Sequence, residues 1–161
     1  MAALEEAFGD AVQRQITDDA SFDKWKASAA RREIVAFVTR LNNSCVNKPN
    51  LRLDEAPPQI RKLMDALRAI AKGCDQYLPK PGEARRYGSP MFRDWHAWLV
   101  SSTPELVSSL GSDNAELSAR LAASFGDRTR IDYGTGHECA FVVFLLGCCK
   151  LQLINDSDID S

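Results

Sequence analysis

The chain has 161 residues, of which 45% are hydrophobic and 26% are charged, with a net charge of -2 from 20 Lys and Arg against 22 Asp and Glu. This length suits one domain with a real core, and this composition excludes a disordered or fibrous protein. Without a basic surplus, the sequence argues against a nucleic-acid or membrane-surface partner. Its longest apolar run, Cys139 to Cys149, is far shorter than the ~20 residues that a membrane-spanning helix needs.

The cysteines indicate a reducing compartment. There are 5 of them, an odd number, and no pair has the C-x-x-C spacing of a zinc or redox motif. The chain also begins without the apolar stretch of a secretory signal peptide. We therefore expect free thiols and a cytoplasmic location, with the nucleus as a second compartment.

The amino-terminal half contains two strongly periodic segments. Apolar side chains recur at positions i, i+3, i+4 and i+7 between Ile34 and Leu41, which predicts a helix over 22–42. A second stripe of the same spacing predicts a helix over 57–77, where the prolines at its start occupy the first turn, a position that tolerates them.

The carboxy-terminal half continues in the same way after a loop rich in proline and glycine. An aromatic stripe predicts a helix over 90–101 with His96 off its apolar face, and a capping-box pattern predicts a separate short helix over 102–110. Further helices are predicted over 114–125 and 137–153, the last being the central and most buried helix. Since no segment alternates at period two, the fold class is all-α.

The stretch DYGTGHE, directly before the last apolar helix, is the best candidate for a site. Gly134 and Gly136 allow consecutive backbone amides to face a ligand at a helix start, where a phosphate is favoured. Thr135 would add a hydroxyl donor, and Asp132 or Glu138 could lie near a magnesium ion. The alternative is a tight turn in which Thr135 or Asp132 caps the helix.

Other familiar site chemistries lack support in the sequence. No Walker A loop and no Gly-x-Ser-x-Gly nucleophile elbow is present. His137 has no second histidine four residues on, so we expect it to make a hydrogen bond within the site or to a buried carbonyl rather than to bind zinc. Asp132 beside Arg130 has the alternative reading of a surface ion pair. Cys148 and its neighbour are expected to be inert buried thiols.

Three stretches in order carry a family resemblance: FDKWKASAARREIVAFVTRLN (22–42), RRYGSPMFRDWHAWL (85–99) and RIDYGTGHE (130–138). Together they resemble the phosphotyrosyl phosphatase activator family, whose members activate protein phosphatase 2A. The resemblance implies the multi-helix core of the phosphatase 2A activator fold. Members are longer, and their Gly-x-x-Gly-Val-Trp-Gly-Leu-Asp-Asp type motif is absent here.

The resemblance therefore predicts a partial fold. Residues 1–18 are expected to be a flexible amino-terminal segment, and residues 19–161 a partial helical activator domain that is truncated before the carboxy-terminal lid region. An apolar surface is expected where the remaining half of the family fold would lie.

The resemblance also implies an activity. Family members act as peptidyl-prolyl cis-trans isomerases on the phosphatase catalytic subunit, with Mg-ATP, so the implied partners are that subunit and a proline-containing peptide segment. The alternative is a non-catalytic binding chaperone or scaffold for the same subunit. No catalytic residue is assigned, and Asp132 and Glu138 are the candidate ligands for Mg²⁺. The implied ATP-binding residues are Arg86, Gly88, Arg93, Asp132, Gly134, Thr135, Gly136, His137 and Glu138. For Arg86, Gly88 and Arg93, the alternative is a solvated loop followed by an arginine on a helix surface.

Overall fold

The computed structural model describes residues 2–49, 52, 54–79, 82 and 88–160. The regular elements in this part of the chain are all helices, so the all-α prediction is confirmed. None of these helices is long and apolar enough to cross a membrane.

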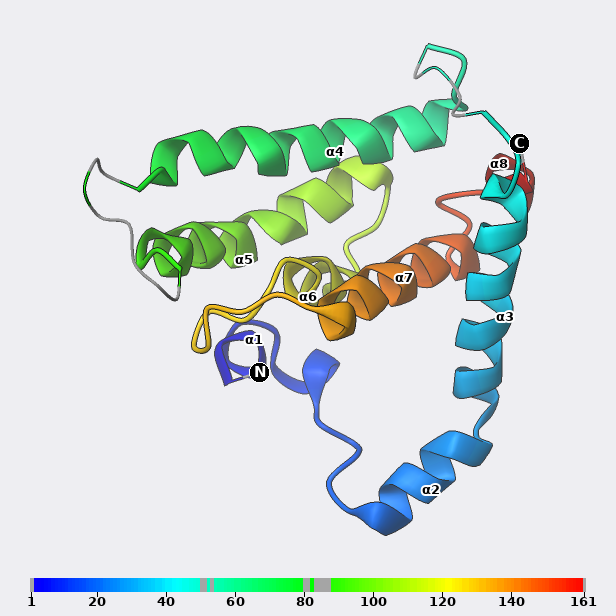
Figure 1. Ribbon diagram of the computed structural model, residues 1–161, viewed down its shortest axis with the longest axis horizontal. Coiled ribbons are helices and arrows are strands. Elements are labelled where there is room, and N and C mark those ends of the chain that lie inside the picture. Colours follow the sequence, from blue (N-terminus) through cyan, green and yellow to red (C-terminus); the bar gives the residue numbers. More distant parts are fainter. Residues whose placement is uncertain (1, 50–51, 53, 80–81, 83–87, 161) are drawn as a thin grey trace.

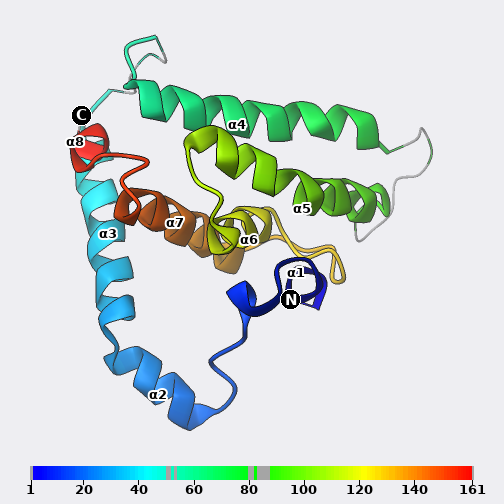
Figure 2. The same ribbon diagram turned by 180° about the vertical axis from the view of Figure 1, so that it is seen from behind.

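The helices form a packed body and a projecting arm (Figures 1 and 2). In the body, α4 packs on α5, α5 on α6 and α6 on α7, while α2 and α3 form the arm beside the end of α7. The elements are α1 (Ala2–Phe8), the 3-10 helix η1 (Gly9–Val12), α2 (Asp19–Ala27), α3 (Ala29–Cys45), α4 (Pro58–Cys74), the 3-10 helix η2 (Asp75–Tyr77), α5 (Met91–Leu110), α6 (Ala115–Ala123), α7 (Thr135–Lys150) and α8 (Asp156–Asp160).

The most enclosed helix is α6, which lies between α5 and α7. Five of its 9 residues are buried, including Leu121 and Ala122. In α7 only Phe144 and Cys148 are buried, although this helix is apolar on all its faces. The prediction that the last apolar helix is the central one is therefore wrong, because the residues that the structure describes leave one side of α7 uncovered.

The helix predicted over 22–42 is two helices, α2 and α3, that meet at Ser28. Ser28 has an extended backbone, with ψ 155°, and its side chain accepts a hydrogen bond from the Arg31 amide to cap α3. Serine is more favourable at such a cap than in a helix interior. The apolar period runs on through Ser28, so periodicity alone does not reveal that one helix ends and another begins there. Asp18 and Ser21 close a capping box at the start of α2.

Residues 90–110, predicted as two helices, form the single helix α5 with Pro104 inside it. Proline has no amide hydrogen, so the carbonyl of Val100 loses its usual partner four residues on. The Thr103 hydroxyl donates to that carbonyl instead, at 3.1 Å. Ser102 likewise bonds the Trp98 carbonyl at 2.9 Å rather than capping a new helix. Thr103 thus compensates the proline, while Ser102 bonds a carbonyl within the helix, and neither caps a new one.

Residues 1–18, expected to be a flexible segment, contain α1 and η1 packed on α6. Leu4 and Val12 are buried against Ala119 and Ala122. Phe8 and Ala11 pack against the same cluster, so apolar side chains from both short helices anchor this segment.

The other predicted helices agree with the structure. The segment 57–77 corresponds to α4 and η2, 114–125 contains α6, and 137–153 overlaps α7. The cysteines within the described residues, which include all five, are free thiols. The fold therefore places the DYGTGHE stretch at the junction of α6 and α7.

Candidate functional site

A closed loop joins α6 to α7 and holds the candidate site. Gly126 begins it at φ +115°, and a Cβ there would lie 2.7 Å from the Asp132 carbonyl oxygen and 2.8 Å from the Phe92 ring. The Asp127 amide donates to the Asp132 carbonyl at 3.1 Å, which makes an isolated antiparallel bridge. Only glycine fits at the start of this loop, both for its backbone angle and for the space available.

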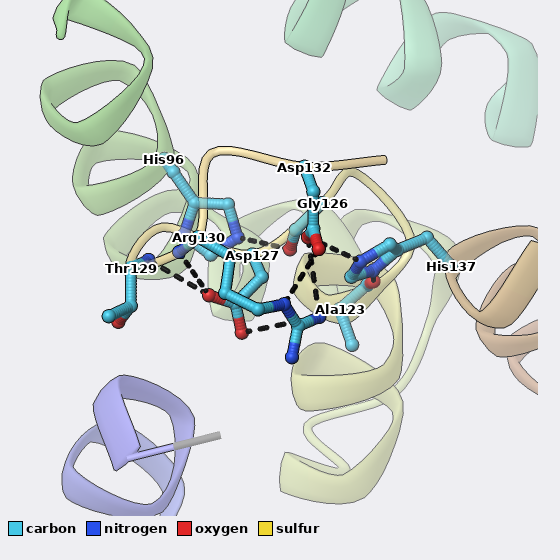
Figure 3. Close-up of polar contacts among 8 residues, drawn as sticks. All are labelled: His96, Ala123, Gly126, Asp127, Thr129, Arg130, Asp132 and His137. Carbon is cyan, nitrogen blue, oxygen red and sulfur yellow. Dashed lines mark hydrogen bonds and ion pairs between the residues drawn. The ribbon is translucent and has the colours of Figure 1, made fainter. Parts of the chain in front are cut away.

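The side chain of Asp127 fixes the tip of the loop. Its Oδ1 accepts hydrogen bonds from the amides of Thr129 and Arg130, both at 2.9 Å (Figure 3). Burial alone would raise the pKa of Asp127, but the amide bonds and the nearby Arg130 charge outweigh it and hold that pKa below its usual value. An aspartate that accepts from amides two and three residues on is a known turn signal, and it could have been recognised in the sequence.

His96 on α5 supports the loop from beneath. Its Nε2 donates to the Gly126 carbonyl at 3.2 Å, and the residue is 2% exposed. Its Nδ1 is buried and has no partner among the described residues. Burial lowers the pKa of His96, partly offset by the bond to Gly126. The placement of His96 off the apolar face is therefore wrong: a polar bond to a distant carbonyl draws it inside.

Arg130 and Asp132 form a bidentate pair on the surface of the loop. The Arg130 Nε to Asp132 Oδ2 distance is 2.7 Å and the Nη2 to Oδ1 distance is 3.3 Å. The hydrogen bond from Arg130 lowers the pKa of Asp132. The surface ion pair that the sequence offered as an alternative is thus present, and at this exposure it adds little to stability.

His137 connects the loop to both flanking helices. Its Nδ1 donates to the Ala123 carbonyl at the end of α6, at 2.6 Å, and its Nε2 lies 3.6 Å from Asp132 Oδ1. The ring of Tyr133 stacks on it with centroids 5.8 Å apart. His137 therefore makes the carbonyl bond expected from the sequence, and Figure 3 shows it facing Asp132 across the loop.

The helix start is open at its backbone. Gly134 is the N-cap residue of α7 with an extended φ of -174° and makes no side-chain cap bond. The Gly134 carbonyl accepts hydrogen bonds from the amides of His137 and Glu138. The amides of Thr135 and Gly136 have no hydrogen-bond partner among the described residues. A Cβ at Gly134 or Gly136 would meet no atom within 4 Å. Neither Thr135 nor Asp132 caps the helix, so packing alone does not explain these glycines.

The remaining predicted residues that the structure describes lie before α5, on α5 and on α7. Gly88 touches the loop, because a Cβ on it would lie 2.9 Å from Ile131 Cγ2 and its φ is +90°. Arg93 is exposed in the first turn of α5, and Glu138 is exposed in the first turn of α7. Arg86 lies outside the described residues. Within the described part of the chain no three His, Cys, Asp or Glu side chains gather to hold a metal ion.

The chain matches one family along nearly its whole length. The sequence profile described as "Phosphotyrosyl phosphate activator (PTPA) protein" matches residues 12–161. A serine/threonine-protein phosphatase 2A activator 2 of Yarrowia lipolytica is 35% identical over 146 residues, which are 88% of this chain and 41% of the relative. Activator 1 of Mycosarcoma maydis is 34% identical over 154 residues, or 90% of this chain and 31% of the relative.

An activator from Drosophila melanogaster is 28% identical over 156 residues, which are 94% of this chain and 39% of the relative. These matches and the all-helical fold define the class of protein. The chain belongs to the phosphotyrosyl phosphatase activator family, so the resemblance read from three motifs is confirmed. It spans less than half the length of these curated relatives.

Proposed function

We propose that this chain takes part in the activation of protein phosphatase 2A. The observation that carries the proposal is the family match over residues 12–161, together with relatives that are named as phosphatase 2A activators. The finer proposal is peptidyl-prolyl cis-trans isomerase activity on a proline-containing segment of the phosphatase catalytic subunit. The cytoplasm and the nucleus are the proposed locations, since the free cysteines suit a reducing compartment.

Isomerisation makes modest demands on side-chain chemistry. The barrier to rotation about a peptide bond is ~18–20 kcal/mol, and it falls when a site binds the twisted amide better than the planar one. A dry, shaped surface can supply this without a nucleophile or a metal. We accordingly assign no catalytic residue.

The open amides at the start of α7 support the assignment of this site to the phosphates of ATP. Amides without partners at a helix N-terminus favour anions, and the free space around Gly136 allows close approach. Arg130 lies on the adjoining loop and could contribute counter-charge. Bound ATP would supply negative charge and a ligand set for magnesium.

The residues at this site fit a magnesium ion only together with a bound nucleotide. Asp132 is already paired with Arg130, and Glu138 is a lone exposed carboxylate. Mg²⁺ commonly binds through one or two carboxylates together with phosphate oxygens and water. We therefore propose that the ion arrives with the nucleotide, with Asp132 and Glu138 as its nearest carboxylates on this chain.

The test combines three measurements on this chain: phosphopeptide dephosphorylation by the phosphatase 2A catalytic subunit, isomerisation of a proline peptide, and calorimetric titration with ATP and Mg²⁺. Gly136→Val should remove ATP binding by crowding the backbone amides. Ala115→Val is the matched control, because it places valine at the exposed start of α6. No activation by this chain would refute the function. Equal ATP affinity in both variants would refute the nucleotide site alone.

A non-catalytic chaperone or scaffold for the catalytic subunit is the second candidate. It is carried as the alternative because no residue set in the sequence demands catalysis. Capture of the catalytic subunit to the same extent with and without ATP, and an unchanged isomerisation rate, would select it. Acceleration of isomerisation would exclude it.

A further inference from the structure

An apolar groove lies between α4 and α7, and its floor is made by α5 and the end of α6. Its volume is about 650 Å³. Since α4 packs on α5 and α7 packs on α6, the two walls stand apart, as Figures 1 and 2 show. The groove is lined by Leu67, Ile70, Ala71, Cys74, Trp95, Ser124, Phe125, Tyr133, Glu138, Phe141 and Val142.

Each wall is the apolar stripe of a helix. On α4 the half-buried Ile60 and Leu67 share the face that continues to Cys74. On α7 the apolar side chains that line the groove are Phe141 and Val142. From Leu67 to Cys74, the part of α4 that lines the groove, the stripe extends about 10 Å at the ordinary helical rise. This length can seat about two turns of a third helix, which packs between neighbours at about 8–10 Å from each axis.

The composition of α7 favours a cover over the groove. A helix that is apolar on all its faces is normally enclosed on all its faces. Here only Phe144 and Cys148 are buried, and the side chains that face the groove are half exposed. The sequence of α7 therefore suits an environment with more neighbours than the described residues supply.

The polar groups of the groove specify what the cover should carry. At one end stand the Glu138 carboxylate and the Tyr133 ring. A complementary helix needs an apolar stripe and a basic residue toward Glu138. So few polar groups in a groove of this volume argue against a small ligand, which needs several to fix its orientation.

We infer that this groove is the seat of an amphipathic helix from the part of the activator fold that lies outside the region shared with this chain. The relatives devote more than half of their length to that part, since the matched segment is 41% of the Yarrowia protein and 39% of the Drosophila protein. A segment joined to the same domain reaches a groove at a high effective concentration, which a separate partner does not.

The test uses a chimera in which this chain replaces the 146 matched residues of the Yarrowia activator. Ala71 is exposed and lines the groove, whereas Ala69 is exposed on another face of the same helix. In this chain alone, Ala71→Glu and Ala69→Glu should leave the melting temperature unchanged. In the chimera, Ala71→Glu should lower it by several degrees, while Ala69→Glu should have no effect. No difference between the two variants in the chimera would overturn the inference.

A second measurement reports cover of the groove without any mutation. Maleimide labelling of Cys74, a half-exposed thiol in the groove wall, should be at least tenfold slower in the chimera than in this chain. Equal rates would overturn the inference. Light scattering on this chain should give a monomer. A dimer that Ala71→Glu dissociates and Ala69→Glu does not would instead assign the groove to a second copy.

Discussion

Gly73 on α4 lies against the Trp98 indole of α5, so Gly73→Ala tests the packing of the body. A Cβ at this position would lie 2.0, 2.2 and 2.8 Å from atoms of the Trp98 indole on α5. Real carbon contacts are almost never this short, and an aromatic ring cannot bend away. The ring must move as a unit, which also disturbs its contact with Tyr77, whose centroid lies 6.4 Å away.

The magnitude follows from two opposing effects. Overpacking costs about 1–3 kcal/mol, and replacing glycine by alanine in a helix returns up to ~1 kcal/mol. The net destabilisation should be about 1–2 kcal/mol. For a domain of this size, each kcal/mol corresponds to about 2–4 °C in melting temperature, so a decrease of roughly 2–8 °C is expected.

Thermal unfolding followed by circular dichroism measures this shift. Gly136→Ala is the matched control, since a Cβ there would meet no atom within 4 Å. That variant should melt at the wild-type temperature or slightly above it. A Gly73→Ala protein that melts at or above the wild-type temperature would show that α4 and α5 do not pack as closely as described.

Three further outcomes can be measured on this chain. Asp127→Ala should cost about 1–2 kcal/mol in urea unfolding because two amides lose their acceptor. The exposed Asp65→Ala should change stability by less than ~0.5 kcal/mol. Burial lowers the pKa of His96 from 6.5, so the unfolded state takes up the proton first, and stability should fall as pH drops below 6.5. His96→Gln should flatten that decline. Burial raises the pKa of Cys148 to about 12, so maleimide should label the exposed Cys139 quickly and spare Cys148 until the chain unfolds.

The sequence predicts the helices well because their apolar stripes are long, and it fails where one polar side chain has two possible roles. Ser28 caps a helix, while Ser102 and Thr103 bond carbonyls within one. Both roles suit the same residue types, and only the path of the neighbouring backbone decides between them. A capping-box pattern before a proline therefore does not by itself end a helix.

Some features of the candidate site could be predicted from the sequence and others could not. The open helix start at Gly134 and Gly136 could be predicted from local sequence, because it depends on neighbours in the chain. The support from His96 could not, since its partner, the Gly126 carbonyl, lies 30 residues away. Likewise, whether a helix is central depends on the elements that pack around it. The apolar composition of α7 therefore led to a wrong prediction of its position.

The loop and the groove share the first turn of α7, which makes their properties depend on each other. Tyr133, which stacks on His137, is 62% exposed and borders the groove together with Glu138. The field of a helix start is weak where water reaches it and stronger where water is excluded. A helix seated in the groove would remove water from this end. ATP with Mg²⁺ should therefore bind the chimera more tightly than this chain, by roughly tenfold if ~1.4 kcal/mol is gained. Calorimetric titration of both proteins measures the difference, with Gly136→Val in the chimera as the control. Equal affinities would show that the groove does not influence the helix start.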